Sequence, residues 1–250
     1  MPERVVRVLR GHSNSRVELI GCDDQLWIRK SGDIARNIER MHALRDIMPF
    51  PQIIRVEDDM YEMEYIYPHQ DMASWLTYNQ PVDLIQWLHG MISRLQADTR
   101  KDYTDTYRVK LSNPSLGPWW AHLPFDQDQL IVRLPSVLPA GPYHGDFTLE
   151  NILHSPTRGF VTIDPLTSPY DSWVFDLAKL SQDLLCGWFI RHTRVAIDAK
   201  LATISNSLAQ RYRWWADPHL AILMLLRVLP YTSTDADRRW LLTEIGKLWK

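Results

Sequence analysis

The side chains best suited to chemistry lie close together in the second half of this 250-residue chain. His144, Asp146 and Asn151 stand in the spacing His-x-Asp-x4-Asn, and Asp164 follows at the end of an apolar run. Transfer of a phosphoryl group needs a carboxylate at the attacking hydroxyl and oxygen ligands that hold Mg²⁺ on the phosphates. This stretch supplies both kinds of group, so it is a candidate site for phosphoryl transfer.

The spacing predicts a role for each polar residue, because it is the spacing of kinase catalytic loops. Asp146 would act as the base or orient the hydroxyl, while Asn151 and Asp164 would bind Mg²⁺, which prefers oxygen ligands. His144 is expected to brace the loop rather than to carry a proton. Alternatively, the stretch is only a turn in which Asp146 and Asn151 cap backbone groups, as Asp and Asn do readily.

Two charged residues earlier in the chain favour the phosphoryl-transfer interpretation. Lys30 ends a β-rich run, and Glu39 lies on the helix expected next. A kinase presents its phosphate-contacting lysine and the glutamate that orients it in this order. Each residue alone is more typical of a solvated surface charge, so their order carries the prediction.

A turn between the first two expected strands is a candidate for covering the phosphates of a nucleotide. Ser13, Asn14 and Ser15 are small or polar residues that let backbone amides approach an anion. The turn lacks a GxGxxG pattern, and a simple hairpin turn rich in Ser and Asn explains it equally well.

The last strand of the first region is a candidate for binding the base of the nucleotide. In a kinase with two lobes, the connecting strand offers backbone hydrogen bonds to the adenine ring. The candidates are Met63, Glu64, Tyr65 and Ile66.

Sequence patterns predict two regions that position these residues. Residues 1–67 form a small lobe of antiparallel strands with one helix over 34–48, whose apolar residues recur every three or four positions before two prolines. Residues 68–250 form a larger lobe, mostly helical, with a β-rich stretch over 143–163. The strands expected in the first lobe cover 4–9, 16–20, 25–30, 53–57 and 61–66. The helices expected in the second lobe cover 71–78, 84–95, 115–134, 173–189 and 196–214, with two more after residue 218.

The composition is that of an ordinary folded protein and limits the class of partner. Hydrophobic residues make up 45% and charged residues 23%, and the net charge of -2 gives no general attraction to nucleic acid or anionic membranes. The apolar run 220–229 is too short to span a bilayer, and the first residues lack the apolar stretch of a signal peptide. Two distant cysteines favour neither a disulfide scaffold nor a zinc site. We therefore expect a cytoplasmic protein in which any binding of phosphate is local.

The stretch 143–153 together with 163–165 resembles the aminoglycoside phosphotransferase and choline kinase-like family, small-molecule kinases with a protein-kinase-like fold. The resemblance implies an α+β fold in two lobes, ATP and Mg²⁺ as cofactors, and phosphorylation of a hydroxyl on a sugar, amino alcohol or aminoglycoside-like acceptor. It also implies that Asp176, in the sequence Asp-Leu-Ala, has a structural role.

Departures from protein kinases favour a small-molecule acceptor. Gly145 stands where protein kinases carry Arg, Pro165 follows Asp164 in place of Phe-Gly, and no Ala-Pro-Glu follows. Protein substrates selected through an activation loop are therefore not expected.

The acceptor-binding residues are not evident from the sequence. The Trp pairs at 119–120 and 214–215 could stack on a sugar ring or enclose a cation, although helix-borne aromatics more often belong to the core. Asp171, Asp183 and Asp217 could bind an amino group, but a solvated position is the usual one for each.

Two alternatives to an active enzyme remain. One is a pseudokinase that binds nucleotide and regulates a protein partner without turnover. The other is a helical interaction protein in which the motif occurs by chance.

Overall fold

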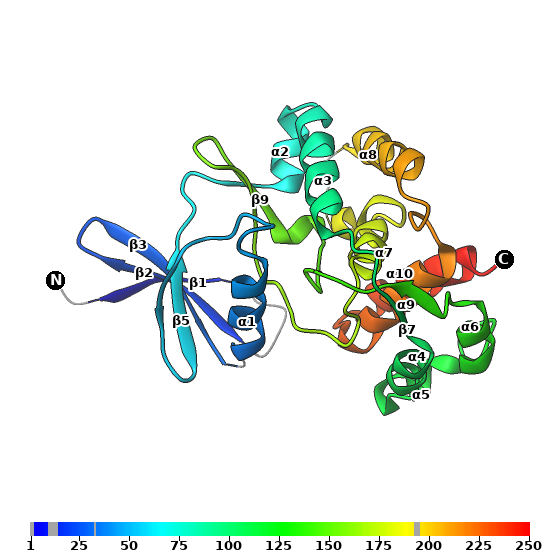
Figure 1. The fold of residues 1–250 in the computed structure, drawn as a ribbon. Coiled ribbons are helices and arrows are strands. Elements are labelled where there is room, and N and C mark those ends of the chain that lie inside the picture. The colour runs from blue at the N-terminus through cyan, green and yellow to red at the C-terminus, as the bar shows by residue number, and fades with distance from the viewer. Residues whose placement is uncertain (1–2, 10–14, 33, 193–195) are drawn as a thin grey trace.

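The strand-rich and the helical part lie side by side in the computed structural model, which describes residues 3–9, 15–32, 34–192 and 196–250 (Figure 1). Two candidates for covering phosphates, Ser13 and Asn14, lie outside the described residues.

The strand-rich part is an antiparallel sheet of five strands in the order β1-β2-β3-β5-β4, as far as the chain is described. Helix α1 follows β3 and lies between the sheet and the helical part (Figure 1). The elements are β1 (Arg4–Leu9), β2 (Arg16–Cys22), β3 (Gln25–Ser31), α1 (Ala35–Leu44), β4 (Ile53–Val56) and β5 (Met60–Glu64).

A small cluster of buried side chains joins the sheet to α1. Tyr61 and Ile28 project from the sheet, and Met41 projects from the helix. The other buried members are Leu19, Ile34 and Met63.

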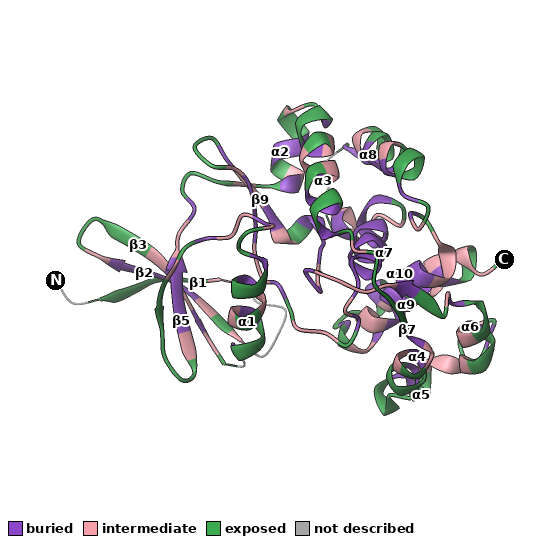
Figure 2. Cartoon of the chain, in the orientation of Figure 1, coloured by how far each residue is buried: buried purple, intermediate pink, exposed green. Residues whose placement is uncertain are grey.

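Helices make up most of the second part, in which all residues of α7 are buried. Figure 2 shows α7 and α9 as the buried centre, with more exposed helices around them. The helices are α2 (Met72–Tyr78), α3 (Val82–Leu95), α4 (Thr104–Leu111), α5 (Gly117–Trp120), α6 (Gln127–Arg133), α7 (Trp173–Leu184), α8 (Asp198–Arg211), α9 (Pro218–Val228) and α10 (Asp235–Leu248). Short 3-10 helices cover Pro114–Leu116, Leu149–Asn151, Trp188–Ile190 and Leu229–Tyr231.

Two small sheets complete the helical part. One has the strand order β10-β9-β6, in which β9 and β10 form a hairpin that follows Asn151. The other pairs β7 with β8, just before the predicted catalytic loop. Their strands are β6 (Gln70–Asp71), β7 (Arg100–Asp102), β8 (Val137–Pro139), β9 (Ile152–Ser155) and β10 (Gly159–Thr162).

The structure confirms the predicted α+β class with a small antiparallel sheet and a larger helical part. The division at residue 67 stays a prediction. Helix α1 is shorter than expected, because it ends at Leu44. The helix expected to reach residue 189 ends at Leu184, three residues before Gly187, which has a positive φ of 73°. The loosely defined stretch 115–134 consists of short helical pieces: Pro118 lies in the first turn of α5, and Pro124 lies between α5 and α6.

The apolar run 220–229 lies inside α9 and the turn after it, as predicted for a core helix. Over the described part of the chain, no helix combines the length and the apolar character needed to cross a membrane.

Candidate active site

The predicted catalytic loop has a conformation that only glycine fits at position 145. Gly145 has a positive φ of 88°, and a Cβ atom there would lie 2.0 Å from the carbonyl oxygen of Leu166. The amide of Leu166 in turn donates to the carbonyl of His144 at 2.8 Å. The glycine therefore brings the catalytic loop into contact with the segment that follows Asp164.

Asp176 of helix α7 holds the backbone of this loop. Its two carboxylate oxygens accept hydrogen bonds from the amides of His144, at 2.5 Å, and Gly145, at 2.8 Å. Burial raises the pKa of Asp176 to about 7, although the two amide hydrogen bonds act in the opposite direction. The structural role that the resemblance implied for Asp176 fits these contacts.

His144 is fully buried and accepts a hydrogen bond from the amide of Asp146 through Nδ1, at 3.3 Å. Burial lowers the pKa of His144 to about 4, so its ring is neutral near pH 7. Its ring stacks on Phe50, with the centroids 6.1 Å apart. These contacts agree with a bracing role and not with a proton carrier.

Asp146 is held by partners on both carboxylate oxygens. Lys179 Nζ lies 3.0 Å from Oδ1, and Asn151 Nδ2 donates to Oδ2 at 3.1 Å and to the carbonyl of Asp146 at 2.8 Å. Burial favours a raised pKa for Asp146, but the charge and hydrogen bond of Lys179 outweigh it and hold the pKa below its ordinary value. Asp146 is therefore ionised near neutral pH.

Asp183 supports the same loop from further along α7. It is fully buried, and its Oδ2 accepts a hydrogen bond from the amide of Leu149 at 2.7 Å. Burial raises the pKa of Asp183 to about 8. The solvated position expected for this residue is wrong, because Asp183 faces the catalytic loop inside the protein.

Three charged side chains of α7 thus contact the catalytic loop from one helix face. Asp176, Lys179 and Asp183 are three and then four residues apart, which places them on the same side of a helix. Lys179 was not predicted as a functional residue from the sequence. The signal was available, because charged residues at this spacing interrupt an otherwise apolar helix.

Asp164 adopts a backbone conformation that is unusual for a residue with a side chain. Its φ is +55°, and the amide of the preceding Ile163 donates to the carbonyl of Asn151 at 2.9 Å. Strained backbone of this kind is concentrated at functional sites, where surrounding contacts maintain it. This hydrogen bond joins the backbone next to Asp164 to that of Asn151, so it holds the two predicted metal-binding residues near each other.

Lys30 reaches Asp164 from the strand-rich part. Its ammonium lies 2.7 Å from Asp164 Oδ1, and its side chain is only 5% exposed, against 38% for Asp164. The predicted phosphate-binding lysine and one predicted metal ligand are therefore adjacent across the two parts of the molecule.

Glu39 lies elsewhere in this structure. It is exposed on α1 and accepts a hydrogen bond from Thr167 Oγ1 at 3.2 Å, so among the described residues Lys30 pairs with Asp164 and not with Glu39. Asn37, on the same helix, is the buried polar residue, and its Nδ2 donates to the carbonyl of Pro165 at 2.7 Å. Helix α1 thus contacts the segment after Asp164 through Asn37 and Glu39.

The oxygen donors present fit a magnesium ion. Asp164 offers a partly exposed carboxylate, and Asn151 uses its Nδ2 for Asp146, which leaves its Oδ1 to bind a cation. In the described part of the chain, no group of three or more His, Cys, Asp or Glu side chains could hold a metal. Magnesium does not need such a group, because it is commonly bound by one or two protein oxygens together with waters and substrate phosphates.

The candidates for binding the base lie at the end of β5 and just beyond it. Met63 and Ile66 are buried, whereas Glu64 and Tyr65 are half-buried. The carbonyl of Ile66 already accepts a hydrogen bond from His69 Nδ1 at 2.5 Å. Ser15, the described part of the turn that was expected to cover phosphates, comes just before β2.

The hairpin of β9 and β10 ties the catalytic part to the strand-rich part. Arg158 forms an ion pair with Glu64, and the amide and hydroxyl of Thr162 both donate to the carbonyl of Pro49, at 2.8 and 2.9 Å. Burial favours a raised pKa for Glu64, but its hydrogen bonds with Arg158 and the amide of Gln52 hold the pKa below its ordinary value. The Glu64 side chain is therefore already engaged.

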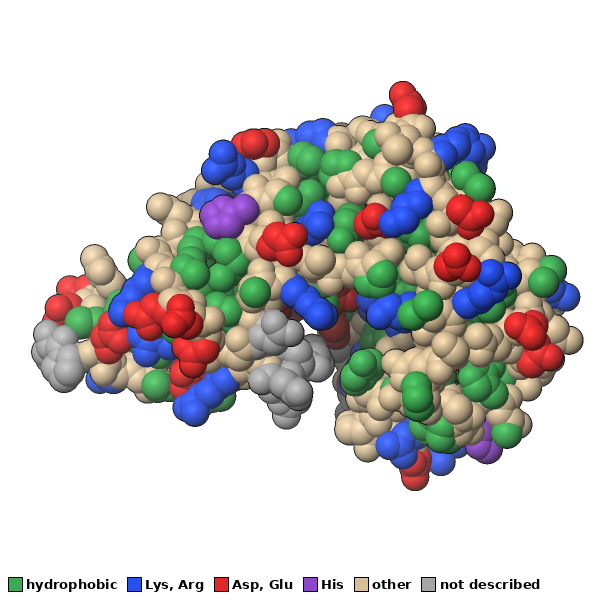
Figure 3. Space-filling model, turned by 60° about the horizontal axis from the view of Figure 1, so that its bottom comes forward, with side chains coloured by type: hydrophobic (Ala, Val, Ile, Leu, Met, Phe, Trp, Pro, Cys, Tyr) green, Lys and Arg blue, Asp and Glu red, His purple; other side chains and the backbone are tan. Residues whose placement is uncertain are grey.

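The surface is hollowed between the strand-rich part and the helical part that projects at lower right in Figure 3, and Lys and Arg side chains lie beside the hollow. A cavity of about 410 Å³ lies between α1 and the loop before the catalytic loop, lined by Arg40 and Tyr143 among others. The acceptor candidate Asp171 lines this cavity, whereas the described residues predicted to serve catalysis, metal binding and nucleotide binding do not.

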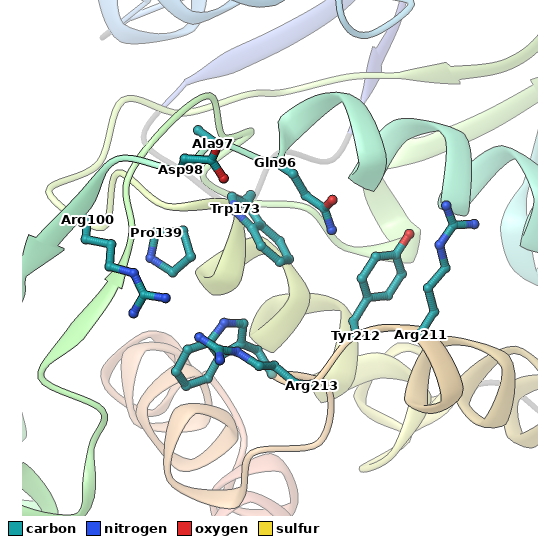
Figure 4. A pocket seen from close by; sticks show the side chains of 10 residues that line it. Gln96, Ala97, Asp98, Arg100, Pro139, Trp173, Arg211, Tyr212 and Arg213 are labelled. Atoms are coloured by element: carbon teal, nitrogen blue, oxygen red, sulfur yellow. The ribbon is translucent and has the colours of Figure 1, made fainter.

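A second cavity, of about 380 Å³, lies within the helical part (Figure 4). Trp173, Tyr212 and Trp214 line it, together with Arg100 of β7 and with Arg211 and Arg213 at and just after the end of α8. Trp119 and Trp120 of α5 pack against the core, as is usual for aromatic residues on helices, and Trp215 is buried in the turn between α8 and α9.

The remaining acceptor candidates have structural partners. Asp171 forms an ion pair with Lys101 at 2.9 Å, and Asp217 caps the start of α9 by accepting from the amides of His219 and Leu220.

Solved structures of small-molecule kinases have the same fold. An apo thermostable mutant of aminoglycoside phosphotransferase APH(4)-Ia superposes with a TM-score of 0.67 at 12% identity, covering 97% of this chain and 92% of that one. A ternary complex of the same enzyme with ADP and hygromycin B gives a TM-score of 0.64 at 12% identity, covering 98% and 93%. An ethanolamine kinase of Plasmodium vivax gives 0.59 at 10% identity, covering 98% of this chain and 81% of that one.

The chain therefore has the protein-kinase-like fold of these small-molecule kinases, as the sequence resemblance implied. No protein-family model and no curated protein sequence matches it.

Proposed function

We propose that this protein is an ATP-dependent kinase that transfers the γ-phosphoryl group to a hydroxyl of a sugar, amino alcohol or aminoglycoside-like acceptor. The observation that carries the proposal is the convergence of Lys30, Asp146, Asn151 and Asp164 in one place from distant parts of the chain. The neighbour that binds ADP and hygromycin B supports a nucleotide and a polyhydroxylated acceptor.

Asp146 would orient the attacking hydroxyl and receive its proton. The hydroxyl oxygen forms a bond to the γ-phosphorus, while the bond from that phosphorus to the oxygen bridging the β- and γ-phosphates breaks and ADP leaves. A carboxylate with a lowered pKa is a weak base, so its main contribution is orientation, with proton transfer late in the reaction.

The nucleotide would lie between the two parts of the molecule. Lys30 would exchange Asp164 for the α- and β-phosphates, and Ser13, Asn14 and Ser15 would cover them. The backbone of residues 63–66 would bind the adenine ring, with Glu39 kept as the proposed partner that orients Lys30. Mg²⁺, bound by Asn151 and Asp164, would neutralise charge on the phosphates. Residues 1–67 would thus serve the nucleotide and residues 68–250 the acceptor, in a cytoplasmic protein with no role in binding nucleic acid or membranes.

Thermal unfolding tests the nucleotide site. ATP with Mg²⁺ at about 100 times its Kd stabilises by ~2.7 kcal/mol, which raises Tm by several degrees. We expect this rise for the native chain, its loss in Asp164→Asn, and its retention in Asp105→Asn, a control at an exposed carboxylate of α4. The absence of any rise in the native chain would contradict the proposal.

Release of ADP during incubation with sugars, amino alcohols and aminoglycosides tests turnover. Asp146→Asn should bind ATP normally and lose turnover by at least about 100-fold, because proton acceptance and positioning of the hydroxyl are both impaired. Nucleotide binding without turnover in the native chain would favour a pseudokinase that regulates a protein partner.

A further inference from the structure

A buried ammonium group lies directly against the proposed catalytic carboxylate. Lys179 Nζ is 3.0 Å from Asp146 Oδ1, and the Lys179 side chain is 10% exposed. The residue lies in the middle of α7, where all residues are buried. A lysine is rarely buried to this extent unless it is paired.

Packing alone does not account for a lysine at this position. The residues around it on α7 include Ala178 and Leu180, which fill the core without charge. Burying an ammonium group is costly, and apolar residues of similar volume often serve a fold as well as a buried ion pair or better. The charge at position 179 therefore has a use other than filling space.

The geometry indicates what the charge does: Lys179 is the second side chain that binds the Asp146 carboxylate. Asn151 binds Oδ2, whereas Lys179 binds Oδ1, so the two donors together fix the plane of the carboxylate. The backbone of the same loop is held separately, by Asp176 at His144 and Gly145. Without Lys179, the loop would keep its backbone contacts while the carboxylate would lose one of its two side-chain partners.

We propose that Lys179 is the positioning residue of Asp146: it holds the carboxylate in the orientation that receives the acceptor hydroxyl. This inference rests on the proposed kinase function and deepens it. Misplacement of a reacting group by about 1 Å costs on the order of 100-fold in rate. Since Lys179 acts through Asp146, its effect should be on kcat and should depend on the carboxylate being present.

A double-mutant cycle measures this dependence. Lys179→Met keeps the length of the side chain and removes the charge, and we expect kcat for ADP release with the best acceptor to fall roughly 30- to 100-fold while KM for ATP changes less than about twofold. In the Asp146→Asn background, the same substitution should change the residual rate less than about threefold. Lys179→Arg should restore part of the lost kcat, because a guanidinium can still donate to Oδ1.

Lys200→Met is the matched control. Lys200 is also a lysine of the helical part with a structural role, since its Nζ donates to the carbonyls of Leu76 and Asn79 at the end of α2. This variant should lose stability and keep its kcat. A Tm rise with ATP and Mg²⁺ in Lys179→Met would show that the variant is folded and that the nucleotide site is intact.

Four results would contradict the role proposed for Lys179. If Lys179→Met keeps the native kcat, the inference is wrong while the proposed function stands. The same conclusion follows if Lys179→Met lowers the rate by the same factor in the native chain and in the Asp146→Asn variant. If Lys179→Met is unfolded, failure of Lys179→Arg to recover any kcat despite a native Tm overturns the inference. If the native chain releases no ADP with any acceptor, the proposed function fails and the inference fails with it.

Discussion

The predicted catalytic loop and the five-stranded sheet are supported in different ways. The loop between His144 and Asn151 is bound by buried side chains of α7, which lies in the main core. The sheet is supported by one small cluster against α1, and large hydrophobic side chains on its strands are exposed, including Val5 and Ile54. The predicted catalytic loop thus rests on the most buried helix of the second part, whereas the sheet rests on a smaller cluster and exposes more of its apolar side chains.

This difference in burial fits the proposed function. Groups that orient a reacting atom need a rigid support, whereas a lobe that admits and releases a nucleotide needs to open. The two parts are joined by polar pairs, such as Lys30 with Asp164 and Arg158 with Glu64, and by apolar contacts of Leu44 and Met48 with the main core. The comparison predicts that substitutions near the catalytic loop cost more stability than equivalent ones in the sheet.

The largest effect is expected for Gly145→Ala. A methyl group there would meet the carbonyl oxygen of Leu166 at 2.0 Å, and the φ of +88° is unfavourable for alanine. We expect a loss of about 3 to 5 kcal/mol in the free energy of unfolding, measured with denaturant. Gly159→Ala is the control, because its φ is +70° but its surroundings are open, so only about 1 to 2 kcal/mol should be lost. If both variants lost the same free energy of unfolding, the close approach of Leu166 to Gly145 would be contradicted.

Helix α1 allows both regions to be compared on one element. Leu44 belongs to the main core and Met41 to the small cluster of the sheet, one turn apart. Leu44→Ala should cost about 3 kcal/mol and Met41→Ala about 2 kcal/mol, because the small cluster can collapse more easily around a cavity. Denaturant unfolding followed by tryptophan fluorescence measures both values. A larger loss for Met41→Ala would reverse the order of rigidity proposed for the two regions.

Asp183 makes the support of the catalytic loop sensitive to pH. Its pKa is about 8 in the folded protein and about 4 when unfolded, so between these values the folded state holds one more proton than the unfolded state. The free energy of unfolding therefore decreases as pH rises from about 4 to about 8, by up to ~1.4 kcal/mol per pH unit from this group.

Asp183→Asn should flatten this dependence, because the amide keeps an acceptor for Leu149 and does not titrate. Denaturant unfolding at several values between pH 5 and 8 should give a shallower slope than the native chain shows. Asp105→Asn, at an exposed carboxylate, serves as the control and should leave the slope unchanged. Parallel slopes for Asp183→Asn and the native chain would mean that Asp183 is ionised in the folded state.

The smallest effect is expected at the polar contact between the two parts. Arg158→Gln removes the ion pair with Glu64, but Arg158 is 37% exposed, and partly solvated pairs of this kind contribute less than about 1 kcal/mol. The loss should diminish in high salt. Arg108→Gln, which breaks an exposed pair within α4, should cost still less. A loss of several kcal/mol for Arg158→Gln would mean that the two parts are joined rigidly.

Much of this arrangement could be predicted from the sequence, because local signals were strong. The strands of the sheet, the long helices and the loop with Asp146 and Asn151 follow from periodicity and spacing. Helix α4 was missed because its residues, such as Val109 on its exposed face, give little apolar periodicity. Strands β6, β7 and β8 are too short to show an alternating pattern.

The partners of the site residues could not be predicted, because they depend on tertiary contacts. Lys30 and Asp164 are 134 residues apart in sequence, and nothing in the spacing distinguishes Asp164 from Glu39 as the contact made in this structure. Asp183 resembles a surface residue in sequence but is buried. Its burial could not be predicted because its partner is a backbone amide, which leaves no signature in the sequence.

The close approach of Leu166 to Gly145 brings the predicted catalytic loop against the segment after Asp164. The hydrogen bonds from Leu166 to His144 and from Ile163 to Asn151 join the segments on both sides of Asp164 to the catalytic loop. We therefore expect the loop and the strand end that carries Asp164 to move together. The separation between Asp146 and Asp164 should then stay constant if the sheet shifts relative to them.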